Sequence, residues 1–339
     1  MTQSAIKDIL RKLALGTPLD AAAFRDALAL LSTPEATPPQ QAAFLALLRV
    51  RGETVAEITG AATLLRETML QVDAPADAID IVGTGGDGHG TFNVSTCAAI
   101  VAAGCGLHVA KHGNRAVSSK SGASDVLAAL GVKLDSPRAI VSRAIHDAGV
   151  GFLWAPLYHP LMKTWAPVRA DIGFRSIFNL LGPICNPAGV TRQVVGVFDQ
   201  VWISPIAHTL KNLGSKRAWV VHGSDGLDEL TTTGVTYIAE LKDGQVRARN
   251  ITPQDAGLPR AKLSDLAGGD AQTNAAALRE VLAGKPGPYR DIVLLNTAAA
   301  LIIADRVETL PDGVALASRA IDSGAAQRAL DTLIKITNA

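Results

Sequence analysis

The chain has 339 residues, with 32 Lys and Arg against 31 Asp and Glu, and a formal net charge of +1. This length suffices for one large or two smaller domains, and the balanced charge offers no global field for a polyanion such as DNA. Three cysteines are too few and too scattered for a disulfide framework or a zinc site, and we expect Cys97 and Cys105 to pack in the core. The apolar runs are too short to span a membrane, and residues 1–16 lack the apolar core of a signal peptide. The sequence therefore predicts a cytoplasmic protein that binds neither membrane nor nucleic acid.

Residues 1–72 are predicted to be wholly helical. Apolar residues recur there at spacings of three and four, with breaks at Gly16 to Pro18, Pro34 to Pro39 and Gly52. Asp20 and Thr54 stand at positions typical of N-caps. This segment predicts a small helical domain.

After Val72 the pattern changes to short β-branched runs that alternate with alanine-rich helices. The predicted strands cover residues 78–82, 107–110, 194–198, 218–223 and 292–296, with an antiparallel hairpin over 235–241 and 245–251. The fold class is therefore α/β: a small all-helical domain plus a larger α/β domain with a mainly parallel central sheet.

Two loops in residues 80–131 predict an anion site. The first follows strand 78–82 and is rich in glycine, from Gly83 to Gly90; the second, over 111–122, is basic. Both leave the carboxyl ends of predicted parallel strands, where open α/β sheets bind ligands. No Asp or Glu occurs from Gly88 to Ser124, and glycines at a helix start let backbone N–H groups approach phosphate oxygens. We expect a ligand that bears phosphates.

The glycine-rich loop satisfies the spacing of a dinucleotide fingerprint but lacks its other parts. The acidic residue that should follow about 20 positions later is replaced by His108, Lys111 and His112, so NAD is excluded. No Gly-Lys-Ser/Thr follows the glycines, so the loop is not a Walker A motif either.

Asp228 and Glu229 are adjacent carboxylates just beyond strand 218–223. Mg²⁺ commonly takes one or two protein carboxylates together with substrate phosphates and waters. By position alone, such a pair is more often a solvated turn.

Long stretches of the chain resemble the anthranilate phosphoribosyltransferases of tryptophan biosynthesis. The motifs are GTGGD, NVST and KHGNRAVSSKSG, followed by WAPVRADIGFRSIFNLLGPICNPAG over 165–189 and DGLDELTTTG over 225–234. The resemblance implies a fold of the nucleoside phosphorylase and phosphoribosyltransferase type. It also implies that a segment near 158–184 returns to the helical domain (1–72) as a hinge, which leaves 73–157 and 185–339 to the α/β domain.

The resemblance implies two substrates and Mg²⁺. The residues expected to contact phosphoribosyl pyrophosphate are Gly83, Gly86, Asp87, Thr91, Asn93, Ser95, Thr96, Lys111 and Ser119. Those expected to contact anthranilate are Gly83, His112, Asn114, Arg169 and Pro183, and the expected metal ligands are Ser95, Asp228 and Glu229. Asp87 is expected to order the N–H groups of its loop or to act through the metal, and the role of Arg115 stays open between phosphate contact and loop bracing.

The chemistry of such a transfer fits these residue types. Pyrophosphate is a good leaving group once backbone N–H groups and a divalent cation meet its charge, and the aromatic amine of anthranilate is unprotonated at neutral pH. We therefore expect no catalytic nucleophile and no strong general base. Arg169 suits the acceptor carboxylate because a guanidinium binds it in bidentate geometry, although alone it would be read as a solvated helix arginine.

Two other functions remain as alternatives. A nucleoside phosphorylase of related fold would need base-recognising groups in place of Arg169 and Asn114. A nucleic-acid-binding relative should carry excess Lys and Arg along a groove, which the near-equal charge totals disfavour. The resemblance also implies a homodimer formed through the helical domain. At Cys185 the family commonly has Thr, and at Ser176 the Thr-to-Ser change keeps a hydroxyl.

Overall fold

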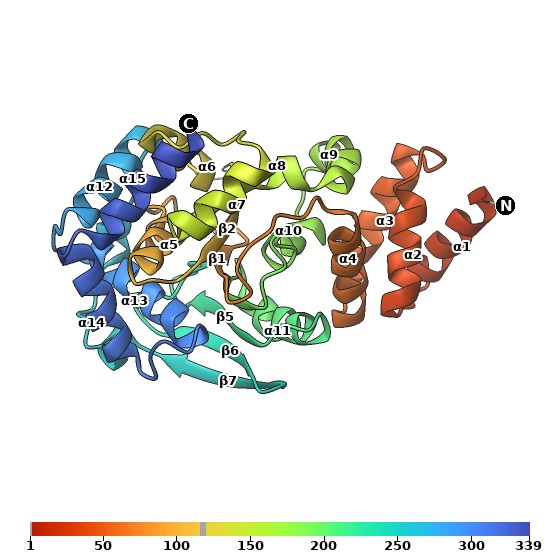
Figure 1. The fold of residues 1–339 in the computed structure, drawn as a ribbon. Coiled ribbons are helices and arrows are strands. Elements are labelled where there is room, and N and C mark those ends of the chain that lie inside the picture. Colours follow the sequence, from red (N-terminus) through yellow and green to blue (C-terminus); the bar gives the residue numbers. More distant parts are fainter. Residues whose placement is uncertain (1, 116–119) are drawn as a thin grey trace.

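In the computed structural model, which describes residues 2–115 and 120–339, four helices come first and form one end of the molecule (Figure 1). They are α1 (Thr2–Ala14), α2 (Ala21–Leu31), α3 (Pro38–Arg51) and α4 (Val55–Thr68). The predicted N-caps are confirmed: the side chain of Asp20 accepts from the N–H of Ala23, and Thr54 forms a capping box with Glu57.

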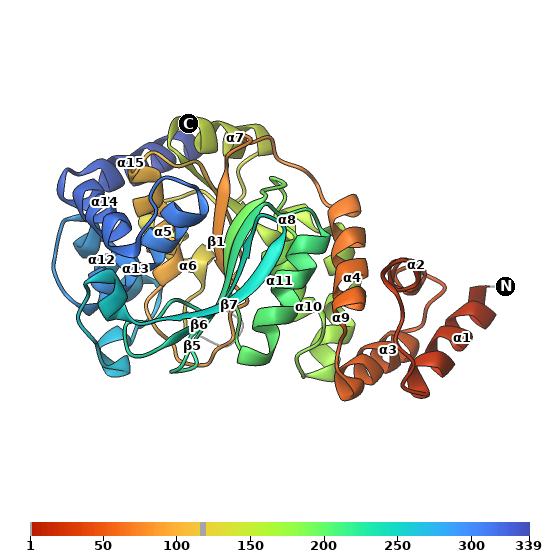
Figure 2. The ribbon, with the colours of Figure 1, turned by 90° about the horizontal axis from the view of Figure 1, so that it is seen from below.

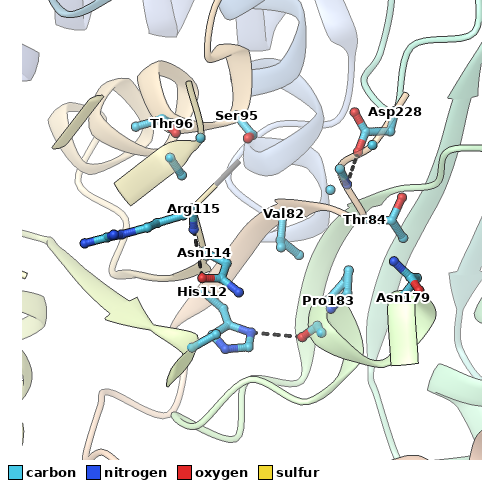
Figure 3. Close-up of a pocket in the computed structure, with 18 of the residues that line it drawn as sticks. Val82, Thr84, Ser95, Thr96, His112, Asn114, Arg115, Asn179, Pro183 and Asp228 are labelled. Atoms are coloured by element: carbon cyan, nitrogen blue, oxygen red, sulfur yellow. Dashed lines mark hydrogen bonds between the residues drawn. The ribbon is translucent and has the colours of Figure 1, made fainter. Parts of the chain in front are cut away.

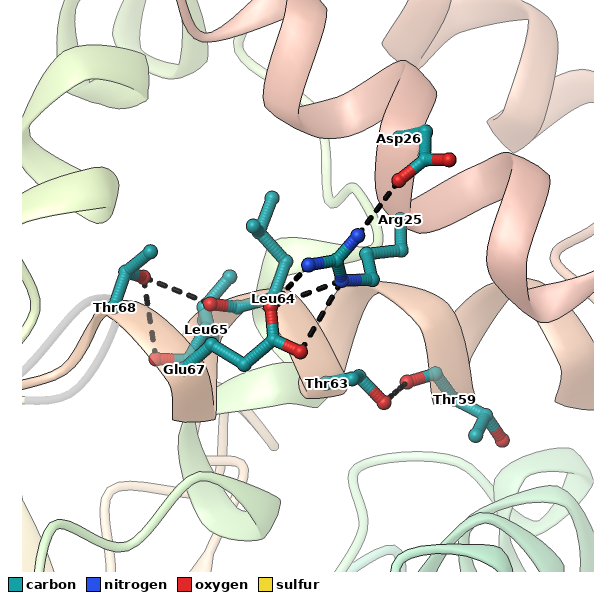
Figure 4. Close-up of polar contacts among 8 residues, drawn as sticks. All are labelled: Arg25, Asp26, Thr59, Thr63, Leu64, Leu65, Glu67 and Thr68. Atoms are coloured by element: carbon teal, nitrogen blue, oxygen red, sulfur yellow. Dashed lines mark hydrogen bonds and ion pairs between the residues drawn. The ribbon is translucent and has the colours of Figure 1, made fainter.

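Helices α2 and α4 are in close contact, which Figure 4 shows together with the ion pair of Arg25 and Glu67. A Cβ added at Gly60 of α4 would lie 2.3 Å from the carbonyl oxygen of Ala21. The helices can approach this closely only because Gly60 has no side chain.

The larger part of the chain forms a seven-stranded sheet in the order β3-β2-β1-β4-β5-β6-β7. The strands are β1 (Ile79–Gly83), β2 (Val109–Gly113), β3 (Val150–Trp154), β4 (Arg192–Gly196), β5 (Arg217–Gly223), β6 (Thr236–Lys242) and β7 (Gln245–Ile251). Strands β1 to β5 run parallel to one another, β6 pairs antiparallel with β5, and β7 pairs antiparallel with β6. This confirms the predicted α/β fold class and the predicted hairpin.

Helices cover both faces of the sheet, as Figures 1 and 2 show. The helices of this part are α5 (Val94–Gly104), α6 (Ala123–Leu130), α7 (Arg138–Asp147), α11 (Ile203–Asn212), α12 (Ala271–Leu282), α13 (Pro288–Ile303), α14 (Leu310–Asp322) and α15 (Ala325–Thr337). On one face of the sheet Ile79, Ile81 and Trp219 share a core with α5, α13, α14 and α15. On the other face Val82, Val195 and Val220 share a core with α4 and α11. Short 3-10 turns lie at Gly182–Ile184, Gln200–Trp202, Pro253–Ala256 and Leu263–Leu266.

One predicted strand is wrong and one strand was missed. Residues 292–296 lie inside α13, which is buried along almost its whole length, so the apolar run carries no periodicity that separates helix from strand. Strand β3 was missed, and β2 extends to Gly113 because it pairs with β3 along that length. Lys111 and His112 therefore belong to a strand and not to the loop predicted over 111–122.

The segment between β3 and β4 contacts the N-terminal helices. It contains α8 (Ala155–Tyr158), α9 (Pro160–Ile172) and α10 (Phe178–Leu181), and α9 packs against α3 and α4. Trp165 of α9 is fully buried, lies 6.2 Å from Phe44 between ring centroids, and donates to the hydroxyl of Ser32 at 2.9 Å.

The cysteines are buried as free thiols, including Cys97 and Cys105 as expected. Within the part of the chain that the structure describes, the helices are too short or too polar to cross a membrane.

Candidate functional site

A cavity of about 420 Å³ opens at the carboxyl ends of β1 and β2. Strand β1 lies between β2 and β4, so the sheet order reverses there, and open α/β sheets bind ligands at such a switch point. Figure 3 shows side chains from several elements facing this space. The predicted site residues that line it are Gly83, Gly86, Asp87, Thr91, Asn93, Ser95, Thr96, Lys111, His112, Asn114, Arg169, Pro183, Asp228 and Glu229. Ser119 lies outside the described residues.

Asp228 sits between the ends of two strands, and two glycines make room for it. A Cβ at Gly196 would lie 1.6 Å from the carbonyl oxygen of Asp228, and one at Gly83 would lie 2.3 Å from its carboxylate. The N–H of Gly85 donates to the same carboxylate at 2.7 Å (Figure 3). The position of this acid is therefore fixed by backbone on both sides.

Glu229 is held by the start of α5, and the residue that follows it is held by α13. The N–H of Ser95 donates to its carboxylate at 3.0 Å. The side-chain amide of Asn296, fully buried on α13, accepts from the N–H of Leu230 at 3.1 Å and donates to its carbonyl at 2.9 Å. Sequence reasoning missed Asn296, because it comes from an element far along the chain.

Negative charge is concentrated at this end of the cavity. Burial raises the pKa of Asp228 above its ordinary range, and the neighbouring charge of Asp87 raises it further. Burial also raises the pKa of Glu229, and the charge of Asp228 adds to that rise. Burial lowers the pKa of Lys111, an effect that the charges of Asp80, Glu229 and Asp228 oppose. Lys111 donates to the carbonyl of Ile81 at 2.8 Å and to the hydroxyl of Ser95 at 3.3 Å.

These residues fit Mg²⁺ better than a metal held by protein alone. Among the described residues there is no group of three or more His, Cys, Asp or Glu suited to hold a metal. Two adjacent carboxylates facing a cavity, each disfavoured as an anion, match the partial ligand set that Mg²⁺ completes with phosphates and waters.

The glycine-rich loop is held by a contact within the loop and by a contact from the segment between α9 and α10. Asp87 accepts from the N–H of His89 at 3.2 Å, an ordering contact of the kind expected for it. Arg175, between α9 and α10, donates to the carbonyl of Gly86 and lies 4.3 Å above the ring of Phe198. Arg115 lies 5.5 Å above the ring of Trp154, which favours its loop-bracing role.

The other end of the cavity contains a cation to which the described part of the chain offers no anionic partner. Arg169 of α9 lies 5.3 Å above the ring of Phe178, and burial lowers its pKa. Among the described residues it has neither an ion pair nor a hydrogen bond through its side chain, although it lines the cavity. Apolar atoms of Leu65, Met162 and Ala166 line the same space. This end suits a flat apolar ligand that carries a carboxylate.

His112 and His159 form a buried pair beside this end. His159, which sequence reasoning missed, belongs to the return segment that carries Arg169, and its only local signal was its place before a helix-starting proline. His112 Nδ1 lies 2.9 Å from the carbonyl oxygen of Gly182 and must donate to it, so His112 Nε2 is an acceptor. His159 Nε2, 3.2 Å away, then donates to it. Burial lowers the pKa of His112 to about 3 and that of His159 to about 4, so both rings are neutral at pH 7, with the proton on Nδ1 of His112 and on Nε2 of His159.

Asp80 supports the floor of the site and was also missed. It is fully buried in β1, accepts from the N–H of His112 at 3.2 Å and from the side-chain amide of Asn186 at 2.7 Å. Burial raises its pKa to about 7, and Lys111 opposes that rise. An acid in the middle of an apolar strand was the signal that could have found it.

The histidine pair predicts a loss of stability in mild acid. Burial lowers the pKa of His112 to about 3 and that of His159 to about 4, while unfolded rings titrate near 6.5. The folded state therefore binds fewer protons than the unfolded state below pH 6.5. Stability contributed by the neutral rings is full above that pH and falls as pH decreases towards the folded pKa values. Between pH 6.5 and 5 the expected loss is about 2 kcal/mol for each ring.

Urea unfolding at pH 7.5 and pH 5 measures this loss. In the double variant His112→Asn/His159→Asn, whose side chains do not titrate, the difference between the two urea midpoints should shrink. An unchanged difference in that variant would assign the acid sensitivity to other groups.

Comparisons with known proteins agree with this geometry over almost the whole chain. A model described as "Glycosyl transferase family, a/b domain" matches residues 75–327, and "Glycosyl transferase family, helical bundle domain" matches residues 7–69. An anthranilate phosphoribosyltransferase of Rhodopseudomonas palustris is 58% identical over 333 residues, which are 98% of each chain. One of Beijerinckia indica is 57% identical over 332 residues, 98% of this chain and 97% of that one.

Solved structures give the same result. This chain superposes on the anthranilate phosphoribosyltransferase of Thermus thermophilus with a TM-score of 0.92 and 42% sequence identity. The superposition covers 97% of this chain and 99% of the Thermus chain. That of Saccharomyces cerevisiae, in complex with phosphoribosyl pyrophosphate (PRPP) and Mg, has a TM-score of 0.90 at 30% identity and covers 99% and 98%. With its two glycosyltransferase domains and its close relatives along its full length, the chain belongs to the anthranilate phosphoribosyltransferase family.

Proposed function

We propose that this chain transfers the 5-phosphoribosyl group of PRPP to the amine of anthranilate, with release of pyrophosphate, as a step of tryptophan biosynthesis. The observation that carries this proposal is the distribution of charged groups between the two ends of one cavity. At one end lie a glycine-rich loop and two adjacent carboxylates, and at the other lies a partly buried arginine to which the described residues offer no anionic partner. A nucleoside phosphorylase has no substrate carboxylate for that arginine to bind. The family membership favours neither a nucleoside phosphorylase nor a nucleic-acid-binding role.

The donor half of the site follows from the loops after β1 and β2. We propose that PRPP is bound by Gly83, Gly86, Asp87, Thr91, Asn93, Ser95, Thr96, Lys111 and Ser119. A glycine-rich loop followed by the N-terminus of a helix, here α5, suits phosphate oxygens. Lys111, already 3.3 Å from Ser95, is close enough to the start of α5 to contact the same oxygens.

Asp228, Glu229 and the hydroxyl of Ser95 are the proposed protein ligands of Mg²⁺. When bound, the ion would neutralise charge that develops on the leaving pyrophosphate. The yeast relative, solved in complex with PRPP and Mg, supports this cofactor. The protein's own part is to hold the two carboxylates in fixed positions through Gly85, Ser95 and Asn296.

Arg169 is the proposed partner of the anthranilate carboxylate, with Gly83, His112, Asn114 and Pro183 around the ring and amine. Because His112 is neutral and its Nδ1 proton is given to Gly182, it orients the acceptor without adding charge. No protein nucleophile is needed: the amine nitrogen forms the bond to the anomeric carbon as the bond from that carbon to pyrophosphate breaks, and the amine's proton is released to pyrophosphate or water.

We propose that residues 1–72 and the segment 158–184 act as one helical domain, and that residues 73–157 and 185–339 form the α/β domain. The packing of α9 on α3 and α4 supports this division. A homodimer through the helical domain is proposed on the exposure of Leu15 and Val50, which are 83% and 88% exposed. Light scattering at micromolar concentration should give twice the monomer mass; a monomer would refute this part. Action in the cytoplasm is proposed from the buried, unpaired cysteines.

Growth of a tryptophan auxotroph tests the function in cells. A bacterial strain that lacks its own anthranilate phosphoribosyltransferase should grow without tryptophan when it carries this chain. The Asp228→Asn variant, expressed to the same level, should not support growth. Failure of the parental chain to support growth, with the protein present and folded, would contradict the proposed reaction.

A further inference from the structure

A segment from the last third of the chain runs along the end of the glycine-rich loop. The N–H of Phe92 donates to the carbonyl of Leu266 at 3.0 Å, and the N–H of Gly268 donates to the carbonyl of Gly90 at 2.9 Å. Thr91 and Ala267 form an antiparallel bridge between these two bonds. The segment thus fixes the loop immediately before α5 begins.

Asn274, near the start of α12, connects this segment to the donor half of the site. Its side chain is 1% exposed. Its Oδ1 accepts from the N–H of Gly269 at 2.8 Å, and its Nδ2 donates to Oδ1 of Asn93 at 2.9 Å. Nδ2 of Asn93 in turn donates to the carbonyl of Ser121, in the second loop, at 3.3 Å.

The two ends of this chain of hydrogen bonds determine its direction. An N–H group such as that of Gly269 can only donate, and a backbone carbonyl such as that of Ser121 can only accept. Both amides between them are therefore restricted to one orientation. Asn93 presents its NH₂ group to the second loop, where the described residues provide one acceptor for its two hydrogens, and Asn93 lines the cavity.

We propose that Asn274 is a positioning residue for the phosphoribosyl donor: it holds the amide of Asn93 with its donor side towards the cavity and ties both phosphate-binding loops together. This inference rests on the proposed function, because Asn93 is assigned there to PRPP. Asn274 itself touches neither substrate; it acts through Asn93.

The variant Asn274→Asp tests this role with almost no change in volume. The carboxylate still accepts from Gly269, but it places a second acceptor against Oδ1 of Asn93. If Asn93 turns its amide to avoid that contact, its Oδ1 faces the carbonyl of Ser121 instead. The dissociation constant of PRPP, titrated calorimetrically with Mg²⁺ and without acceptor, should rise about tenfold or more. The KM for anthranilate at saturating PRPP should stay within about twofold of the parental value.

A double-mutant cycle separates positioning from general loosening. In the Asn93→Ala background, Asn274→Asp should weaken PRPP binding no further, because the group it orients is gone. Asn212→Asp, an exposed Asn-to-Asp change on α11, is the matched control and should leave PRPP binding unchanged. Should Asn274→Asp fail to fold, Asn274→Ala removes the same two contacts without adding a carboxylate, and should weaken PRPP binding in the same direction.

Equal PRPP binding by the parental chain and the Asn274 variant would overturn the inference and leave the proposed function standing. The inference would also be overturned if the losses of PRPP affinity caused by Asn93→Ala and Asn274→Asp multiplied in the double variant. The same holds if Asn212→Asp weakened PRPP binding as much as Asn274→Asp does. If the parental chain itself does not bind PRPP, the proposed function fails, and this inference fails with it.

Discussion

Replacing Gly196 with alanine is expected to lower Mg²⁺-dependent turnover about a hundredfold or more, because displacing a catalytic group by about 1 Å can cost that much. The new Cβ would lie 1.6 Å from the carbonyl oxygen of Asp228, which is backbone and cannot rotate away. The loop that carries Asp228 and Glu229 must shift, although neither carboxylate has been altered. The activity should therefore be lost through misplacement of the proposed metal ligands.

The measurement is kcat as a function of Mg²⁺ concentration, with a thermal melt of each variant alongside. Asp228→Asn, which keeps the volume and removes the charge, serves as the comparison and should also lose Mg²⁺-dependent activity. A Gly196→Ala protein that melts near the parental temperature and keeps its Mg²⁺ dependence would show that Asp228 does not need its observed position.

Arg169→Ala is expected to raise the KM for anthranilate about 10- to 100-fold, the worth of a charge-assisted hydrogen-bonded pair of about 1.5–3 kcal/mol. Its guanidinium lines the cavity and lies over Phe178, while the described residues give its side chain no anionic or hydrogen-bonding partner. The KM for PRPP should stay close to the parental value, since the proposed donor site lies at the other end. Arg169→Lys should recover part of the loss, because an ammonium keeps the charge without the bidentate geometry.

Aniline, which has the amine but no carboxylate, gives a chemical control for this prediction. The parental chain should strongly prefer anthranilate to aniline in kcat/KM, and Arg169→Ala should reduce that preference. An Arg169→Ala variant that keeps both the parental KM for anthranilate and the parental preference would remove Arg169 from the acceptor site.

The sequence predicted those parts of the site that have local signals. The glycine-rich loop and the start of α5 were recognisable from residue type and spacing. Asp228 and Glu229, which by position alone are more typical of a solvated turn, were recognised only through the family resemblance. All of these residues line one cavity. The four N-terminal helices were predictable because their apolar residues keep a helical period.

What the sequence did not predict depends on contacts between distant segments. Asn274 and Asn93 are 181 positions apart, and nothing near either residue indicates the other. The importance of Gly196 appears only once Asp228 packs against it. The strand expected at 292–296 failed for a related reason: a helix buried on all sides and a buried strand are both continuous apolar runs.

The most direct test of this account is the fluorescence of anthranilate on mixing with the protein, PRPP and Mg²⁺. Conversion of anthranilate to its phosphoribosyl derivative should make the signal fall with time, and excess chelator should stop the fall because the leaving pyrophosphate is no longer neutralised. A signal that stays constant with PRPP and Mg²⁺ bound would contradict the assignment of the acceptor, and with it the role of Arg169.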